Sequence, residues 1–272
     1  MLNKEDYEEP ACVLCMNPKS RIPIDRVLEK YDSYIEEKAY ERAESHLRYW
    51  LEEAKTGRDE AGELTMLGEL MGHLRKNGKI DEAVSVAASA IARVEKYGFT
   101  DTITGATAIL NAGTVYRAAG KNEESAACYE RAEKVYEAEL KDGDDRLGGL
   151  YNNFASALTE LGEYDRAEER FKKALAIMDG TKNGKLECAI TYLNLADLYE
   201  KRDGSEKAES LTDEMLTKAF ELLTDDSVEK NAYYEFVLDK ENANYIWKVS
   251  VILITPEEAK ALAMEKTAAA EE

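Results

Sequence analysis

The sequence predicts an all-α fold in which similar helix pairs are stacked one after another. The first observation is an internal repeat: three segments superimpose without gaps and share an asparagine at one position, as Asn111, Asn153 and Asn194. The second is composition, because the 272 residues include only 4 prolines and 16 glycines and are rich in alanine, glutamate, leucine and lysine. A repeat of this length indicates an α-solenoid, in which each unit buries its apolar face against its neighbours.

The clearest unit spans residues 148 to about 181. Its first helix is predicted by apolar or small residues at positions i, i+3, i+4 and i+7, namely Tyr151, Phe154, Ala155 and Leu158. Gly162 is expected to end this helix. A second helix follows, and one of its faces carries Tyr164, Ala167, Phe171, Ala174 and Leu175. The small side chain of Ala167 would let the two helices approach closely.

Three other units carry the same pattern in phase, and a degenerate unit precedes them. The four clear first helices are expected to start at residues 64, 106, 148 and 189, with spacings of 42, 42 and 41 residues. In the last of these units, the second helix is expected to extend to Leu223. The degenerate unit begins at about Ile24, and its first helix is marked by Val27, Tyr31 and Tyr34.

These units resemble the tetratricopeptide repeat. That pattern places a small residue within the first helix, a glycine at the turn, and an alanine, an aromatic residue and an alanine on the second helix. The period exceeds the standard 34 residues and is similar to that of kinesin light chains and of some stand-alone bacterial proteins. The resemblance covers roughly residues 24–225 and implies a right-handed superhelix of about five helix pairs. Residues 1–23 are expected to be irregular, and residues 226–272 to form a divergent repeat or capping helices.

The C-terminal part departs from the repeat pattern. Residues 248–254 are rich in β-branched side chains, a composition that fits either an apolar helix or a strand. Thr255, Pro256 and Glu258 then supply an N-cap residue, a proline at the first helical position and a capping-box glutamate. We therefore expect a last helix over residues 256 to about 266, which would cover the end of the stack.

One face of each first helix is unusual for a surface exposed to solvent. Opposite the core positions, two of the four rows are mostly glycine, serine and threonine instead of long charged residues. The resemblance places this face on the concave side of the superhelix and implies that Asn111, Asn153 and Asn194 hold the backbone of an extended peptide. A carboxamide offers the donor and acceptor that this requires. Inheritance by repeat duplication, or local bonding within the stack, is the alternative. Glu69 replaces the asparagine in the preceding unit, so the grip is not expected there.

Neighbouring residues on this face would decide which peptide is preferred. Side-chain pockets are expected next to the asparagines, shaped by Thr114, Ser156 and Asp197. The N-terminal end of the groove is relatively basic because of Arg75, Lys76 and Arg117, whereas the other end is acidic because of Glu160, Asp197 and Glu200. A ligand with complementary charges would fit this gradient, but surface charge scattered without function accounts for it as well.

Composition and the absence of targeting signals argue against several classes of function. The net charge of −20 disfavours nucleic-acid partners and binding to a membrane surface through basic residues. No secretory signal is visible, and the longest apolar run, residues 251–254, is too short to cross a bilayer. The 4 cysteines do not suggest a disulfide framework, so a cytoplasmic location is expected.

No motif predicts an enzyme, a cofactor or a metal site. Cys12 and Cys15 have the spacing of metal ligands or of a redox pair, but a zinc site needs four ligands and the nearest histidine is His46. A metal shared by two chains or a reversible disulfide stays open. Three further residues are expected to be structural, namely His73, Cys128 and Cys188.

The sequence therefore favours a non-enzymatic interaction module that binds an extended peptide or a partner's tail along the groove. The alternative is a structural protein that self-associates, with residues 249–254 and the open end of the stack buried against another copy. A third, weaker hypothesis is a redox-linked or metal-linked adaptor that uses Cys12 and Cys15.

Overall fold

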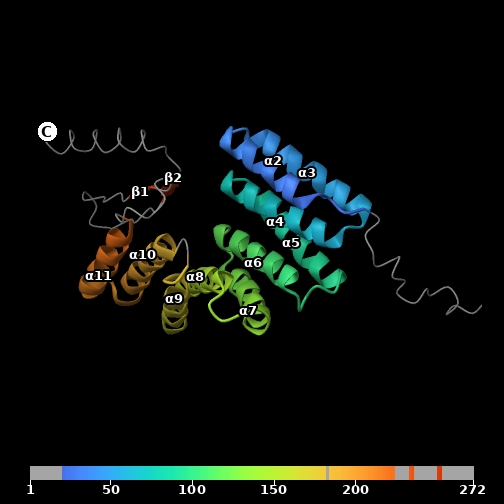
Figure 1. Ribbon diagram of the computed structural model, residues 1–272. Helices are drawn as coiled ribbons and strands as arrows, with labels where there is room; N and C mark the ends of the chain where they lie inside the picture. The colour runs from blue at the N-terminus through green and yellow to red at the C-terminus, as the bar shows by residue number, and fades with distance from the viewer. Residues whose placement is uncertain (1–19, 182–183, 224–232, 236–249, 253–272) are drawn as a thin grey trace, which may run out of the picture. The chain divides into compact units, whose positions relative to one another are not determined.

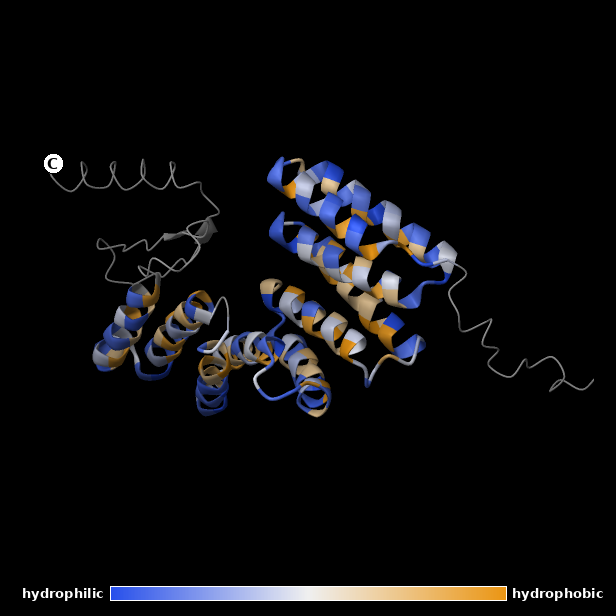
Figure 2. Ribbon diagram, in the orientation of Figure 1, coloured by the Kyte–Doolittle hydropathy of each residue, from blue (hydrophilic) through white to orange (hydrophobic). Residues whose placement is uncertain are grey.

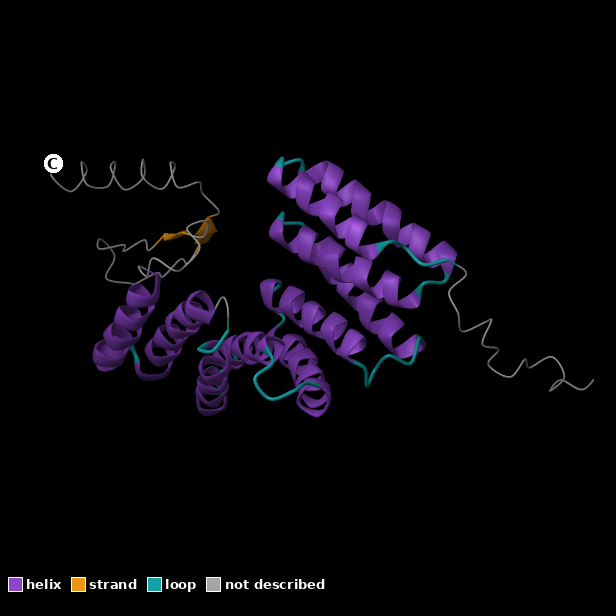
Figure 3. Ribbon diagram, viewed as in Figure 1, coloured by secondary structure: helices purple, strands orange, loops and turns teal. Residues whose placement is uncertain are grey.

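The computed structural model describes residues 20–181, 184–223, 233–235 and 250–252 (Figure 1). Contacts divide the chain into two compact units, residues 1–170 and 171–272. Successive helices pack in pairs, and turns of a few residues join the two helices of a pair (Figure 3). The predicted all-α stack of helix pairs is confirmed.

The helices follow one another along the chain from the N-terminal side of the first unit. Its first helices are α2 (Ile24–Glu36), α4 (Glu60–Lys76), α6 (Ile103–Ala118) and α8 (Asp145–Glu160). Its second helices are α3 (Tyr40–Gly57), α5 (Ile80–Lys96) and α7 (Asn122–Glu139), and α9 (Tyr164–Met178) crosses into the second unit. The second unit holds α10 (Gly184–Asp203) and α11 (Ser205–Leu223).

Glycine ends the first helix of each clear unit. Gly78, Gly120, Gly162 and Gly204 have φ of 73°, 71°, 75° and 79° and recur every 42 residues. This left-handed conformation lets the next amide bond back to the helix, as from Lys79 N to the Leu74 carbonyl at 2.9 Å. In the degenerate unit, Lys38 adopts the same conformation with φ of 55°.

First helices begin earlier than the sequence pattern predicted. They start at residues 60, 103, 145 and 184 instead of 64, 106, 148 and 189. The side chains of Asp59, Thr102 and Asp144 cap three of these starts by accepting a backbone N–H. The apolar pattern marks only the helical turns that pack into the core. The capped first turn of each helix precedes this pattern, so the helix starts predicted from the pattern were too late.

Small residues let the helices of a pair approach closely. A Cβ placed on Gly113 of α6 would lie 3.0 Å from a ring carbon of Tyr129 on α7. Ala155 and Ala167, at corresponding small positions, are completely buried. Each helix carries both apolar and polar residues, as amphipathic helices do (Figure 2). Most of the predicted core is buried, including Phe154, Leu158 and Phe171.

The C-terminal segment contains a strand where the sequence left helix or strand open. β2 (Ser250–Ile252) pairs antiparallel with β1 (Tyr233–Glu235), and Tyr233 lies opposite Ile252. The helix expected over residues 256–266 and the pair Cys12 and Cys15 lie outside the described residues. The second helix predicted to reach Leu223 is confirmed as α11.

Candidate functional site

Three first helices of the first unit, α4, α6 and α8, pack one after another. α4 packs against α6, and α6 against α8. We call the face that carries Glu69, Asn111 and Asn153 the first-helix surface. These three residues occupy the same position in successive repeats, 42 residues apart, and all are half-buried.

Asn111 and Asn153 have polar groups that the protein does not use. In the described part of the chain, neither carboxamide forms a hydrogen bond with another residue. Asn111 lies at the contact between α4 and α6, because a Cβ placed on Gly68 would be 3.3 Å from its Nδ2 atom. Local bonding within the stack therefore does not account for these two asparagines.

The two predicted hydroxyl residues bond mainly to their own helices. Thr114 Oγ1 donates to the Leu110 carbonyl at 3.3 Å and accepts from the Tyr129 hydroxyl at 3.1 Å. Ser156 Oγ donates to the Asn152 carbonyl at 3.0 Å. Bonds of this kind satisfy a hydroxyl within a helix, so these residues contribute small side chains to the surface more than free polar groups.

Asn194 and Asp197 lie on α10 in the second unit. Asn194 is half-buried at the position equivalent to Asn153, and Asp197 is three residues further along the helix. The Asp197 carboxylate pairs with Lys201 Nζ at 3.0 Å. Such an exposed i,i+4 pair contributes about 0.3–0.5 kcal/mol, so it would exchange readily for a ligand's cation.

Arg75 and Arg117 are half-buried in the last turns of α4 and α6. Neither has a hydrogen bond or an ion pair with any residue that the structure describes. Burial and the positive charge of Arg117 lower the pKa of Arg75, and the Tyr129 hydroxyl acts in the opposite direction. Arg117 Nε is buried without an acceptor, and leaving such a donor unsatisfied costs about 1–3 kcal/mol. Lys76 beside them is exposed.

Glu69 gives the α4 part of the surface a different character. Burial raises the pKa of its carboxyl group, the nearby Lys76 lowers it, and Asp32 on α2 raises it again. A half-buried carboxylate thus stands where α6 and α8 have amides. The expectation that the backbone grip does not extend to α4 stays a prediction.

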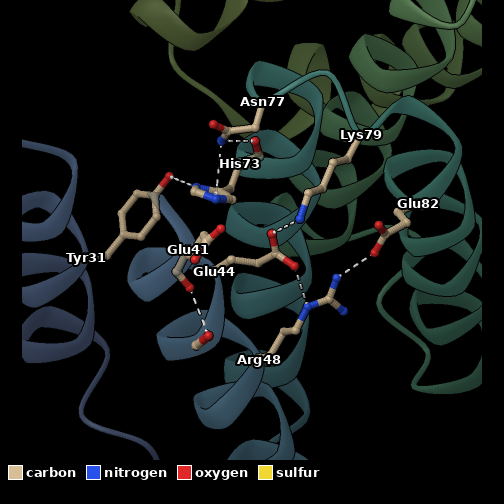
Figure 4. Close-up of polar contacts among 9 residues, drawn as sticks. Tyr31, Glu41, Glu44, Arg48, His73, Asn77, Lys79 and Glu82 are labelled. Carbon is tan, nitrogen blue, oxygen red and sulfur yellow. Dashed lines mark hydrogen bonds and ion pairs between the residues drawn. The ribbon is translucent and has the colours of Figure 1, made fainter. Parts of the chain in front are cut away.

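A buried polar cluster joins α2 to α4 (Figure 4). His73 is only 2% exposed, and its Nδ1 lies 3.2 Å from the Tyr31 hydroxyl. Its Nε2 lies 3.2 Å from Asn77 Nδ2, which also donates to the His73 carbonyl at 2.8 Å. Burial lowers the pKa of the imidazole. The prediction that His73 is structural is consistent with this satisfied, buried environment.

The repeat spacing of the sequence could have predicted the contact in this cluster. Tyr31 and His73 are 42 residues apart and therefore occupy the same position in successive repeats. Next to them, Glu44 of α3 accepts from Lys79 and from Arg48, both at 2.8 Å, and Arg48 reaches Glu82 of α5 at 2.8 Å (Figure 4). Ionic bonds thus continue across the first two repeats.

The described residues do not assemble a metal centre. No group of three or more His, Cys, Asp or Glu residues within them could hold a metal ion. Cys128 and Cys188 are buried, as predicted, and burial raises the pKa of each thiol to about 11. Among the described helices, none is both long and apolar enough to cross a membrane.

Comparison with known proteins points to the same architecture. A family model described as tetratricopeptide repeat matches residues 63–138 and 146–221. The chain resembles the crystal structure of BtubC (BKLC) from P. vanneervenii, with a TM-score of 0.63 and 19% identity over 85% of this chain and 87% of that one. A putative kinesin light chain from Podosopora anserina gives a TM-score of 0.58 and 20% identity over 74% and 94% of the two chains. A comparison with curated protein sequences returns no match.

Proposed function

This chain belongs to the tetratricopeptide repeat family, and we propose that it binds an extended peptide or the tail of a partner protein along its first helices. Repeats of this family mediate protein–protein interaction, and the resemblance to kinesin light chain repeats holds for the fold. The protein acts in this proposal without catalysis or cofactor. A cytoplasmic location fits its free, buried thiols Cys128 and Cys188.

The observation that carries the proposal is the pair of unused carboxamides on the first-helix surface. Asparagine lowers helix stability by about 0.5–0.7 kcal/mol relative to alanine, and neither carboxamide makes a hydrogen bond within the described chain that would offset this cost. Asn111 and Asn153 nevertheless stand at equivalent positions on packed helices without a partner in the described chain. A ligand whose backbone bonds to these carboxamides explains why asparagine stands at both positions.

An extended peptide backbone has the right repeat for this role. Packed helices lie about 8–10 Å apart, and a strand rises about 3.3 Å per residue. Asn111 and Asn153 would therefore meet roughly every third peptide residue, each with one donor and one acceptor. Asn194 repeats the position in the second unit, and Thr114, Ser156 and Asp197 would border pockets for the side chains between these contacts.

Selection from a peptide library against the full chain tests the proposal. We expect enriched peptides of unrelated sequence to bind about tenfold more weakly to the Asn111→Ala/Asn153→Ala variant, because one or two hydrogen bonds of about 0.5–1.5 kcal/mol are lost. Asn194→Ala is measured separately, since it lies in the other unit. Asn122→Ala, on second helix α7, is the matched control and should bind like the unaltered chain.

Two results would count against peptide binding. Affinities that are equal in the double variant and the control would show that the carboxamides take no part. A folded chain that enriches no peptide, and whose light scattering shows association at rising concentration, would favour the alternative of self-association.

A further inference from the structure

The first helix pair carries a tryptophan where the later pairs have a buried alanine. Trp50 is the eleventh residue of α3, and the eleventh residues of α5, α7 and α9 are Ala90, Ala132 and Ala174. These three alanines are completely buried, whereas Trp50 is only half-buried. Among the described helices of the first unit, α2 and α3 lie at one end (Figure 1). A large aromatic side chain thus stands at the open end of the stack.

Trp50 lines a groove of about 540 Å³ between α2 and α3. His46 lies one helical turn before Trp50, and its Nε2 is 3.0 Å from the Val27 carbonyl of α2. Apolar and aromatic residues of the groove are Pro23, Val27, His46 and Trp50, and its polar residues are Arg26, Glu29, Lys30 and Ser33. The groove therefore combines an aromatic wall on α3 with a mostly charged edge on α2.

A row of four aromatic rings follows this side of the pair. The centroids of successive rings are 5.6, 6.4 and 5.3 Å apart and meet edge to face, in the order Tyr34, His46, Trp50 and Tyr49. Tyr49, at the end of the row, is 56% exposed. Aromatic side chains contribute most when their large apolar surface is removed from water. An apolar segment in the groove would complete the burial of these rings.

The chain itself supplies an apolar segment close to this groove. Ser20, the first described residue, donates its N–H to the carbonyl of Gly57 at the end of α3 at 3.1 Å. Residues 11–16, which lie outside the described residues, read Ala-Cys-Val-Leu-Cys-Met and end four positions before Ser20. Asn17 and Pro18, which follow them, are residues typical of turns. The connection is therefore short and suited to a reversal of the chain.

The segment has the length that the groove requires. The lining residues of α2 run from Pro23 to Ser33, which is about 15 Å along the helix. Six extended residues span about 20 Å. Residues 11–16 therefore suffice to fill the groove from one end to the other.

Charge favours this occupant over a second copy of the chain. The groove carries two cations, Arg26 and Lys30, against one acid, Glu29. Residues 1–9, which precede the apolar segment, contain four acidic residues and one lysine, so they complement the groove. In a symmetric contact between two copies, Arg26 and Lys30 would instead face the same cations, and two chains of net charge −20 would repel each other.

We propose that residues 11–16 of the same chain occupy the groove between α2 and α3 and cover its aromatic wall. The apolar side chains of the segment pack against Trp50 and His46. A segment tethered this closely has an effective concentration in the millimolar range, so weak apolar contacts are sufficient to hold it. Cys12 and Cys15 then act as small apolar residues and are withdrawn from solvent. This inference is independent of peptide binding at the first helices.

Thiol reactivity of the full chain tests the proposal. Cys128 and Cys188 are buried, with pKa values raised to about 11, so Cys12 and Cys15 account for the fast reaction with a thiol reagent. We expect both to react about tenfold more slowly than in Leu14→Asn, because only the released segment is open to the reagent. Leu2→Asn makes the same uncharged exchange outside the apolar run and should react like the unaltered chain. Equal rates in all three proteins would overturn the proposal.

Changes in the groove test where the segment binds. Trp50→Ala introduces the residue that the later second helices have, and it should raise the rates at Cys12 and Cys15 about as much as Leu14→Asn does. Tyr40→Ala is the matched control, because Tyr40 is 46% exposed on α3 outside the groove. Urea unfolding checks that these variants are folded.

Lys30→Glu gives the same test without a change in the core. It should raise both rates about two- to fivefold, because a favourable charge at the edge becomes unfavourable. Loss of protection in Leu14→Asn, with unchanged protection in Trp50→Ala and Lys30→Glu, would show that the segment binds elsewhere and overturn the proposal.

Dilution separates the chain's own segment from that of a second copy. Binding within one chain does not depend on protein concentration, so protection of Cys12 and Cys15 should stay constant over about a hundredfold dilution. Protection that disappears on dilution would assign the groove to the segment of another copy and overturn the proposal.

Discussion

Two pairs of residues at equivalent positions of neighbouring first helices differ in whether their polar groups are satisfied. Between α2 and α4, Tyr31 meets His73 from the equivalent position one repeat later, and the two side chains satisfy each other. Between α4 and α6, Arg75 and Arg117 are also one repeat apart, but both are cations and neither has a partner in the described chain. The Tyr31–His73 pair contributes hydrogen bonding within the fold, whereas the two arginines add no such bond.

The difference between the two pairs follows from the chemistry of their side chains. A tyrosine and a histidine offer complementary donor and acceptor atoms, so burying them together costs little. Two guanidinium groups offer donors only. Substitutions at Tyr31 or His73 should therefore change stability, whereas substitutions at Arg75 or Arg117 should leave it nearly unchanged.

The largest expected difference is between paired and unpaired arginines. Arg170 and its partner Glu133 have side chains only 13% and 10% exposed, so Arg170→Gln leaves a nearly buried carboxylate alone and should lower the free energy of unfolding by about 2–4 kcal/mol. Arg117→Gln breaks no hydrogen bond or ion pair of the described chain and removes a buried donor that lacks a partner, so it should not lower the free energy of unfolding. Urea unfolding measures both. Similar losses for the two variants would mean that Arg117 is as well satisfied as Arg170.

The contact between α2 and α4 should make stability depend on pH. Because the pKa of His73 is lowered by burial in the folded protein, the unfolded chain takes up this proton first as pH falls. Stability is full above about pH 6.5 and is lost as pH falls through the folded pKa, by at most about 1.4 kcal/mol per pH unit. The groups that face the ring are Tyr31 on α2 and Glu44 on α3, with Lys76 and Lys79 opposing its charge.

His73→Gln isolates this effect. The difference between the unfolding free energies of the two proteins should shrink from pH 7.5 to pH 5, because glutamine does not titrate. A difference that stays constant over this range would show that His73 has the same pKa in both states.

The degenerate first unit should become more stable when glycine replaces the residue with positive φ in its turn. Lys38 has φ of 55°, where Gly78 and Gly120 occupy the corresponding turns of later units. The backbone bond from Ala39 N to the Tyr34 carbonyl, at 2.8 Å, is already formed. Lys38→Gly removes the strain of a left-handed side-chain residue and should stabilise the protein by about 0.5–1 kcal/mol. Thermal unfolding measures the gain, and an unchanged or lower Tm would contradict it.

The smallest effect concerns the space around Asn111. Gly68→Ala places a methyl group 3.3 Å from Asn111 Nδ2, whereas Gly72→Ala meets nothing within 4 Å. Both exchanges favour the helix by about 0.5–1 kcal/mol, but the first should gain less and should weaken peptide binding several-fold. Equal gains and equal affinities would show that the Asn111 side chain moves aside freely.

Local sequence was sufficient for most of the fold. Glycine at a helix end and apolar residues at helical spacing act within one unit, so Gly162, Phe154 and Phe171 indicated a turn and two buried faces without knowledge of any neighbour. Helix starts were less accurate, because caps such as Asp59 and Thr102 precede the apolar pattern.

The candidate site was only partly predictable. The repeated position of Asn111 and Asn153 identified them as candidate binding residues, and the positive charge of Arg75 and Arg117 did the same for the arginines. The sequence did not show that these groups lack partners, since that depends on which side chains other helices bring near them. In the sequence, Thr114 cannot be told from other surface hydroxyl residues. In the structure, its hydroxyl accepts a hydrogen bond from Tyr129.

The sequence by itself determined the repeat, its period and the side of each helix that is buried, because these follow from residue spacing along one helix. Only the tertiary structure decided which polar groups are satisfied. Satisfaction depends on distances of about 3 Å between atoms on different helices. Tyr31 meets His73 within that distance, whereas nothing in the described chain meets Arg117 Nε.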